Sequence, residues 1–331
     1  MKKKEIYRQL VTRYFSGSAS VEEVEVFFRL LDRGELDEFL PTEGQRPKTV
    51  NIRWYAAAAA IVLFGSAALF WRHTAKPKPA TAQIAANQFL NDKAPGTATA
   101  TLSQSGGQPR TLDSHNNGAQ IKKGGTITTP ASGEFAVTLS DGTRIWLNSL
   151  SRLTVPDDFG KTDRTVNITG EAYVEVAPDP RRPFHVRVGD VDIQVLGTAF
   201  NVNAYGDEPY IKTTLIKGSI KLVRSGNSLL LKPGEEARAD VGGLKIDTGE
   251  NADQALAWKN GYFDLEGADI RTIMRQIARW YGVEIKYEGE PTKERFGGQI
   301  GRDLNLSELL TGLTKNNLHF RLEGNILTVL N

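Results

Sequence analysis

Two glutamates, Glu171 and Glu175, have residue types and a spacing that could carry chemistry. They lie four residues apart in a segment whose alternating pattern predicts a strand, so both side chains point to the same side of it. A pair of carboxylates on one surface can serve as the acid and the base or nucleophile of a glycoside hydrolase. Paired acids on a strand are more often a solvated face, and we interpret these two glutamates in that way.

The other chemistry-bearing residues do not cluster. The four histidines lie in segments of different type, without a second ligand three or four positions away: His73, His115, His185 and His319. The chain contains no cysteine, which removes disulfides, thiolate metal ligands and thiol nucleophiles. It also has no P-loop, no dinucleotide-binding glycine motif and no nucleophile elbow. We therefore expect no metal, no cofactor and no enzyme activity.

Charge argues against one class of partner. The formal net charge is +2 over 331 residues, and opposite signs are well mixed along the chain. Without a large basic field, direct binding to nucleic acid is not expected.

An uncharged apolar run over residues 54–71 separates two polar parts of the chain. At about 1.5 Å per residue, a helix of this length covers roughly 27 Å, close to the ~30 Å hydrocarbon layer of a bilayer. Trp54, Tyr55 and Trp71 stand at its ends, where aromatic rings prefer the membrane interface. We expect a single transmembrane helix here; the alternative is a buried helix of a soluble protein. Basic residues flank the run on both sides, so charge leaves the orientation open.

Residues 1–50 are expected to form a small helical module. An apolar face ends near Gly17, and Ser20 to Glu23 match a capping box that begins a second helix. A short third helix is expected after Gly34. So small a unit leaves apolar surface for a partner protein to cover, although the same residues could form a private core or pack on the membrane.

The next two regions differ in composition and in the periodicity of their apolar residues. Residues 73–120 are rich in Ala, Thr, Pro, Gly, Ser, Gln and Asn and lack a sustained period, which predicts a flexible linker. Residues 121–250 show short alternating runs broken by turn residues, among them a hairpin signal at Asp141-Gly142. They predict an all-β unit.

Residues 257–331 contain an internal duplication. A strand, a helix capped by Asp269 and a strand are followed by a second strand, a helix with a capping box at Asn305 to Glu308, and further strands. Two strand-helix-strand units make an α+β domain with open sheet edges, where a second protein can add a strand. The expected fold class is thus multidomain, with an all-α module, one transmembrane helix, an all-β domain and this α+β domain.

Ordered motifs across the chain resemble a known family. The residues that carry the match in the β region include Asp141, Gly142, Thr143, Trp146, Leu147, Asn148, Gly170, Glu171, Pro183 and Phe184. Together they look like the periplasmic domain of FecR-type anti-sigma factors. The segments around Trp258 and Gly261 and around Trp280 and Tyr281 are similar to the C-terminal domain of Bacteroidetes members, which is related to the short N-terminal domain of secretins and TonB-dependent receptors.

The resemblance implies a signalling relay. Residues 1–50 would be cytoplasmic and would hold an extracytoplasmic-function (ECF) sigma factor through Tyr14, Phe15, Val24, Phe27, Phe28 and Leu31. The rest would lie in the periplasm of a Gram-negative bacterium, anchored once in the inner membrane. A TonB-dependent outer-membrane transporter would present its signalling domain to the C-terminal domain, and periplasmic and intramembrane proteases could complete the signal.

The resemblance also marks Gly197-Thr198, since some members of the family cleave themselves at a Gly-Thr step. The Thr hydroxyl can attack the preceding carbonyl, and Gly tolerates the strained backbone that this requires. Because no base is identifiable nearby in the sequence, we favour a structural role for the dipeptide.

Two other classes of function stay open at this point. In a tethered carbohydrate- or ligand-binding protein, Trp146 and Trp258 would be exposed stacking platforms. An envelope hydrolase would show a cleft with perturbed acids, or a nucleophile with its base.

Overall fold

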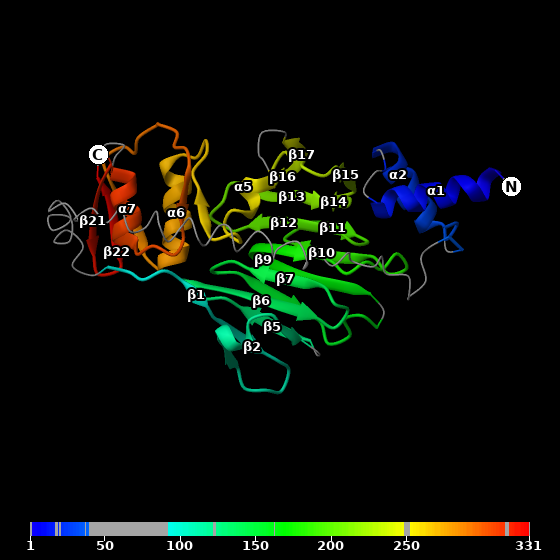
Figure 1. The fold of residues 1–331 in the computed structure, drawn as a ribbon, viewed down its shortest axis with the longest axis horizontal. Helices are drawn as coiled ribbons and strands as arrows, with labels where there is room; N and C mark the ends of the chain where they lie inside the picture. Colours follow the sequence, from blue (N-terminus) through cyan, green and yellow to red (C-terminus); the bar gives the residue numbers. More distant parts are fainter. Residues whose placement is uncertain are drawn as a thin grey trace, which may run out of the picture. The chain divides into compact units, whose positions relative to one another are not determined.

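The computed structural model describes residues 2–16, 19, 21–36, 38–39, 92–121, 124–161, 163–247, 252–314 and 318–330. Three regions are named below: the N-terminal module (2–39), the β-domain (92–247) and the C-terminal domain (252–330). In Figure 1 they run from blue helices through green strands to orange and red elements.

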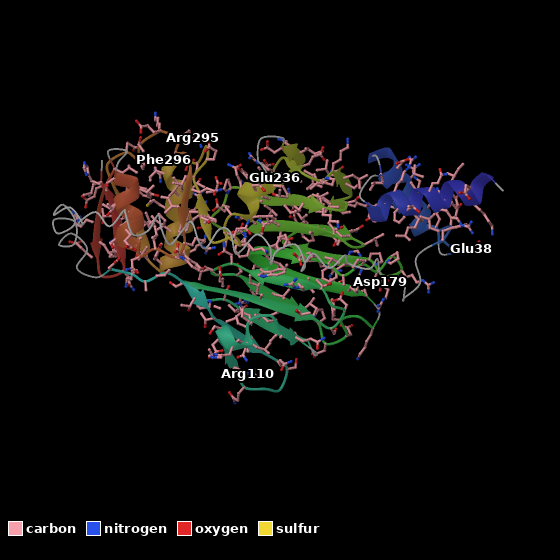
Figure 2. The ribbon with its side chains drawn as sticks, in the orientation of Figure 1. Glu38, Arg110, Asp179, Glu236, Arg295 and Phe296 are labelled. Carbon is pink, nitrogen blue, oxygen red and sulfur yellow. The ribbon has the colours of Figure 1, made fainter. Side chains whose placement is uncertain are left out.

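The N-terminal module is a pair of helices, α1 (Lys2–Ser16) and α2 (Val21–Asp32). The rings of Tyr14 and Phe27 stack with centroids 4.1 Å apart between the helices. Turns, not the expected third helix, follow α2, because Gly34 takes a left-handed conformation with φ of 68°. The turn segment is tied back to α1 by Glu38, labelled in Figure 2, which accepts a hydrogen bond from Lys4 at 2.7 Å.

The β-domain is built from short strands. They are β1 (Thr97–Ala98), β2 (Ala100–Ser103), β3 (Arg110–Leu112), β4 (Ala119–Ile121), β5 (Gly125–Thr128), β6 (Gly133–Leu139), β7 (Arg144–Leu147), β8 (Arg152–Val155), β9 (Arg164–Glu175), β10 (Phe184–Val188), β11 (Val191–Val195), β12 (Ala199–Ala204), β13 (Ile211–Lys217), β14 (Ile220–Arg224), β15 (Asn227–Leu231), β16 (Glu236–Asp240) and β17 (Gly243–Asp247). A short 3-10 helix, η2 (Ser114–Asn116), lies between β3 and β4.

The long strand β9 belongs to both layers of this domain. Its first half pairs with β8 and β10, and its second half pairs with β7 and β12. The change occurs at Gly170, where φ is 84° and a Cβ atom would lie 2.5 Å from the hydroxyl oxygen of Ser151. Only glycine suits this position, because both the backbone angle and the space exclude a side chain.

One apolar core lies between the two layers. Its largest members from both layers include Ile127, Phe135, Leu139, Leu147, Leu153, Phe184 and Phe200. The strands alternate, so every second residue enters this core and the others face outward. Outward-facing residues of β7, β9 and β12 form the surface that the C-terminal domain contacts.

The C-terminal domain contains α5 (Ala252–Leu256), β18 (Tyr262–Asp264), α6 (Ile270–Tyr281), β19 (Glu284–Glu288), β20 (Gln299–Gly301), α7 (Leu306–Thr314), β21 (His319–Glu323) and β22 (Ile326–Leu330). β18 pairs with β20, and β22 lies between β19 and β21. The Asp269 side chain accepts from Thr272 N at the start of α6, and Gly282 ends the helix with φ of 66°.

The expected fold class, with an all-α module of three helices and a transmembrane helix, was wrong for the described residues. The described chain is mostly β-sheet, its N-terminal module has two helices, and none of the described helices is long and apolar enough to cross a membrane. The expected transmembrane helix, with Trp54, Tyr55 and Trp71, lies outside the described residues. The described part of the expected linker contains β1 to β4, because short polar segments here add strands to β5 and β6.

Candidate functional site

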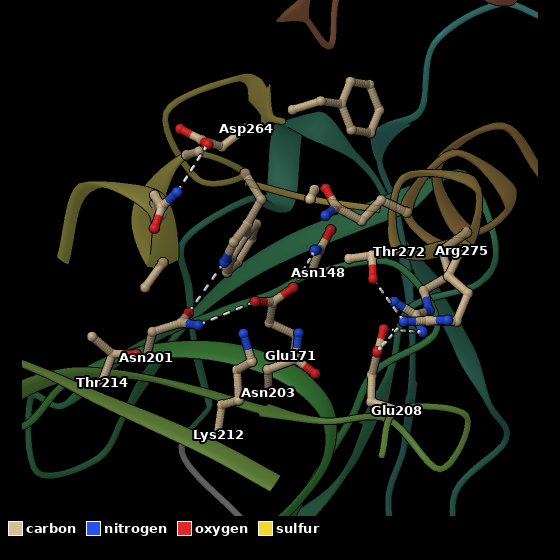
Figure 3. Close-up of a pocket in the computed structure, with 18 of the residues that line it drawn as sticks. Asn148, Glu171, Asn201, Asn203, Glu208, Lys212, Thr214, Asp264, Thr272 and Arg275 are labelled. Carbon is tan, nitrogen blue, oxygen red and sulfur yellow. Dashed lines mark hydrogen bonds and ion pairs between the residues drawn. The ribbon is translucent and has the colours of Figure 1, made fainter. Parts of the chain in front are cut away.

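A cleft of about 1000 Å³ lies between the β-domain and the C-terminal domain (Figure 3). The β-domain contributes outward-facing residues of β9, β12, β13 and β16 and the turn at Asp207 and Glu208. The C-terminal domain contributes α5, β18 and one face of α6. Glu236 and Arg295, both labelled in Figure 2, line it from the two domains.

Glu171 lies in the cleft wall and is buried, with 9% of its surface exposed. Its carboxylate accepts hydrogen bonds from the side-chain amides of Asn148, at 2.8 Å, and Asn201, at 3.1 Å. Burial raises the pKa of Glu171, while these two amides and the positive charges of Arg279 and Arg302 oppose that rise. The interpretation of this residue as part of a solvated face was therefore wrong, because the C-terminal domain covers this part of the sheet.

Glu175 lies near solvent, where it contacts Arg144 at 3.3 Å and accepts from the Tyr173 hydroxyl at 3.1 Å. The two glutamates thus have different surroundings on one strand. Glu171 is held by neutral amides and Glu175 by surface partners, so they do not form a facing acid pair.

Each amide that holds Glu171 is oriented by the C-terminal domain. The indole of Trp258 donates to Asn201 Oδ1 at 3.1 Å, and Arg302 donates to Asn148 Oδ1 at 2.9 Å. Since an indole N–H and a guanidinium can only donate, both amide oxygens must face them. Both amide NH₂ groups then point at the carboxylate of Glu171, as drawn for Asn148 and Asn201 in Figure 3.

Arg302 joins this network to the core of the C-terminal domain. Its guanidinium lies 3.6 Å above the ring of Trp280, and it donates to the backbone oxygen of Trp258 at 2.9 Å. The Trp280 indole in turn donates to the backbone oxygen of Arg302 at 2.9 Å. Glu134 of the β-domain lies 3.7 Å away.

The ion pairs across the cleft come from one row of α6. Arg279 contacts Asp207 at 2.6 Å and Glu208 at 2.9 Å, and Arg275 contacts Glu208 at 2.8 Å. Residues four apart on a helix share a face, so Arg271, also on the cleft, continues the row. That spacing is visible in the sequence, but the acidic partners are about seventy residues away and could not be identified from it.

The residues expected to bind a sigma factor lie mostly inside the N-terminal module. Tyr14, Val24, Phe27 and Phe28 are buried, and Leu31 is partly buried. Leu196 of the β-domain belongs to the same apolar cluster. The Phe15 side chain is not among those that the structure describes. The open alternative of a private core therefore describes these positions better than an exposed binding face does.

Several motif residues of the β-domain have structural roles. Asp141 accepts from the backbone and hydroxyl of Thr143, both at 2.9 Å, at the turn where Gly142 has φ of 88°. The Asp141 carboxylate also pairs at 3.1 Å with Arg164, which is fully buried. Phe184 lies 5.5 Å below that guanidinium. Leu147 and Phe184 are in the core, and Pro183 precedes β10.

Neither of the two tryptophans considered for carbohydrate stacking has an exposed ring face on which a sugar could stack. Trp258 is 9% exposed and its indole nitrogen is used inside the network. Trp146 is half-buried, with Arg144 at 4.5 Å and Lys259 at 4.8 Å from its ring centre. Both cations would have to leave that ring before a sugar could stack on it.

In the C-terminal motif, Gly261 has φ of 85° and Tyr281 donates to the backbone oxygen of Leu304 at 2.8 Å. At the Gly197-Thr198 step, Thr198 is buried and its hydroxyl donates to the backbone oxygen of Ser219 at 2.9 Å. The Thr198 hydroxyl thus links two segments of the β-domain, as expected for a structural role of this residue. Within the described ranges, no group of three or more His, Asp or Glu residues could hold a metal ion.

Comparisons with known proteins agree with this architecture. Two crystal structures, at 1.65 Å and 2.50 Å resolution, of a proposed anti-sigma factor from Parabacteroides distasonis ATCC 8503 each have a TM-score of 0.57 and 24% identity to this chain. The matches cover 62% of this chain and 97% and 98% of those chains, and at this identity they show a shared fold. A comparison with curated proteins gives no match.

Two family models match the chain. The model described as FecR protein matches residues 125–221, in the β-domain, and the model described as FecR, C-terminal matches residues 262–329. The chain therefore contains a FecR domain followed by a FecR C-terminal domain.

Proposed function

We propose that this chain is an anti-sigma factor whose N-terminal module holds an ECF sigma factor. The observation that carries the proposal is the succession of a FecR domain and a FecR C-terminal domain after a helix pair. The protein of shared fold from Parabacteroides distasonis, described as a proposed anti-sigma factor, supports it.

The helix pair has apolar surface for such a partner. Ile6 on α1 is 60% exposed and Val26 on α2 is 42% exposed. Because Phe27 and Phe28 are buried among the helices, changing them would unfold the module and would not report on binding. Ile6 and Val26 are therefore the positions at which binding can be tested without removing the core.

The signal would arrive at the C-terminal domain from the signalling domain of a TonB-dependent transporter. Among the described strands, β19 and β21 each pair with β22 alone, so each has an edge to which a strand can be added. Charged residues alternate along β19 at Glu284, Lys286 and Glu288, which protects an edge against non-specific pairing. Proteolysis of the chain would then free the sigma factor.

The proposal includes a location in the inner membrane of a Gram-negative bacterium, with the module and the C-terminal domain on opposite sides. Residues 41–91, which join the module to the β-domain, lie outside the described residues. The structure packs Leu196 of the β-domain against α1 and α2, a contact that a membrane between the module and the β-domain would not allow. The sigma-binding half and the membrane-crossing relay are therefore tested separately.

Co-purification tests the sigma-binding half. The full chain, its Ile6→Asp and Val26→Asp variants and a Gln9→Asp control would each be offered the ECF sigma factors encoded nearby. Gln9 is exposed on α1, so its variant adds the same charge without removing apolar surface. Selective capture that the two apolar variants weaken at least tenfold and the control does not would support the proposal. No capture by a folded full chain would overturn it.

A further inference from the structure

Several of the contacts that join the C-terminal domain to the β-domain are hydrogen bonds or ion pairs between polar side chains. Trp258 to Asn201 and Arg302 to Asn148 are hydrogen bonds between side chains of the two domains. The apolar core cluster of the β-domain contains no residue of the C-terminal domain. The core of the β-domain therefore does not extend across the junction, and domains that do not share a core are expected to move relative to one another.

The ion pairs differ in their exposure to water, since the side chain of Arg279 is only 9% exposed and its partners are exposed to different degrees. The side chain of Arg275 is 27% exposed and that of Glu208 is 14% exposed. Asp207, the other partner of Arg279, is 58% exposed. The pair with the exposed Asp207 is sensitive to salt and to competing charges, whereas the more buried pair of Arg279 and Glu208 is screened less.

The position of Asp207 and Glu208 links the ion pairs with α6 to the rest of the junction. Asp207 and Glu208 lie in the turn between β12 and β13, and β12 also carries Asn201. The turn, the amide network and Glu171 therefore belong to adjoining strands.

When Glu171 is ionised, its burial makes the closed junction less favourable than it would otherwise be. The carboxylate is held by two neutral amides, and removing an anion from water has a free-energy cost that such bonds only partly offset. Opening the cleft would return Glu171 to water. An ionised Glu171 therefore opposes the closed state, which the hydrogen bonds and ion pairs of the junction hold.

We propose that Arg275 and Arg279 on α6, with Asp207 and Glu208, form an ionic latch, and that breaking it lets the C-terminal domain open from the β-domain. The latch is a regulatory contact within the chain. It needs neither a sigma factor nor a transporter to operate, so it can be tested without either.

Spin labelling of the full chain measures the opening directly. The chain has no cysteine of its own, so cysteines introduced at the exposed positions Asp158 and Glu284 would be the only labelled sites. Pulsed electron resonance then reports the distance between the two domains. The variants are Glu208→Arg, which reverses the central charge, and Glu208→Arg with Arg275→Glu, which restores one attractive pair.

A control reverses charge away from the junction. Asp190 pairs with Arg224 inside the β-domain at 2.8 Å, so Asp190→Arg makes a similar change without touching α6. At low salt we expect one narrow distance for the unmodified latch and for Asp190→Arg. Glu208→Arg should lengthen and broaden the distribution, and the double variant should move it back toward the original distance.

Raising the salt concentration should populate the open distance in the chain with an unmodified latch, because the Debye length falls from about 10 Å at 0.1 M to about 3 Å at 1 M. This measurement needs no variant and remains decisive if Glu208→Arg fails to fold. A distance unaffected both by salt and by charge reversal in folded protein would overturn the latch. So would a double variant that opens as far as Glu208→Arg alone.

Discussion

The indole nitrogen of Trp258 donates a hydrogen bond to Asn201 Oδ1 at 3.1 Å, although the two residues are 57 positions apart. Through Asn201 this bond reaches Glu171. One donor of the C-terminal domain thereby sets the orientation of an amide in the β-domain.

Trp258→Phe tests that bond. The substitution keeps an aromatic ring but leaves a buried amide oxygen without its donor, and we expect a loss of about 1–3 kcal/mol in the free energy of unfolding. Urea denaturation measures it. Trp146→Phe, at a half-buried indole on β7, is the control and should cost less. Equal losses in both variants would show that ring size, not the hydrogen bond, accounts for the effect.

Glu171 should make stability depend on pH. Burial raises its pKa above the value in the unfolded chain, so over the interval between the two values the folded state binds more protons. The free energy of unfolding, taken relative to Glu171→Gln, should therefore rise as pH falls through the pKa of the folded state, and the gain should be complete below the unfolded pKa. Denaturation of both proteins at several pH values gives this difference.

Glu175→Gln is the control for that series, since it changes the same group on the same face of β9 near solvent. A difference between the original chain and Glu171→Gln that falls on acidification would mean that the hydrogen bonds from Asn148 and Asn201 outweigh burial.

The pair of Asp141 and Arg164 should be important for the stability of the β-domain. Arg164 is fully buried, and burial lowers its pKa while Asp141 opposes that shift. Asp141→Ala leaves this charge without its carboxylate partner, and we expect a loss of about 3–5 kcal/mol. Asp190→Ala, which breaks the more exposed pair with Arg224, should cost about 0–1 kcal/mol. Similar decreases in melting temperature for the two variants would show that the buried Asp141–Arg164 pair is no more important for stability than the exposed pair.

Gly170→Ala tests the bend in β9. Gly170 and Gly226 have φ of 84° and 82°, but only at Gly170 would a Cβ atom meet other atoms, with Ser151 Oγ at 2.5 Å. The backbone angle costs about 1–2 kcal/mol at either site, and overpacking adds about 1–3 kcal/mol at Gly170 alone. Thermal unfolding of both variants separates the two effects. Equal destabilisation would exclude the steric part.

Self-cleavage at Gly197-Thr198 can be tested with the intact chain. Because the Thr198 hydroxyl donates to the Ser219 carbonyl, we expect the purified chain to remain whole during incubation, and Thr198→Ala to behave in the same way. Mass spectrometry detects the two fragments that cleavage would produce. Fragments that form in the original chain and disappear in Thr198→Ala would establish the reaction.

Local sequence was sufficient where neighbouring residues decide the conformation. The signal at Asp141-Gly142 predicts the turn that joins β6 to β7, because a positive φ needs glycine and the Asp side chain bonds the turn itself. Asp269 predicts the start of α6 for the same kind of reason, as its oxygen accepts from Thr272 N three residues away. These interactions close within a few residues, so no tertiary contact is needed to specify them.

Tertiary structure decided which of the outward faces is covered. Alternation places Glu171 and Glu175 on one side of β9, but only the C-terminal domain buries the first and leaves the second near solvent. Likewise, the spacing of Phe27 and Phe28 predicts an apolar face and leaves open whether a partner or α1 covers it. Periodicity specifies the direction of a side chain relative to its own backbone. What it then meets depends on segments far away in the chain, whose position the pattern does not encode.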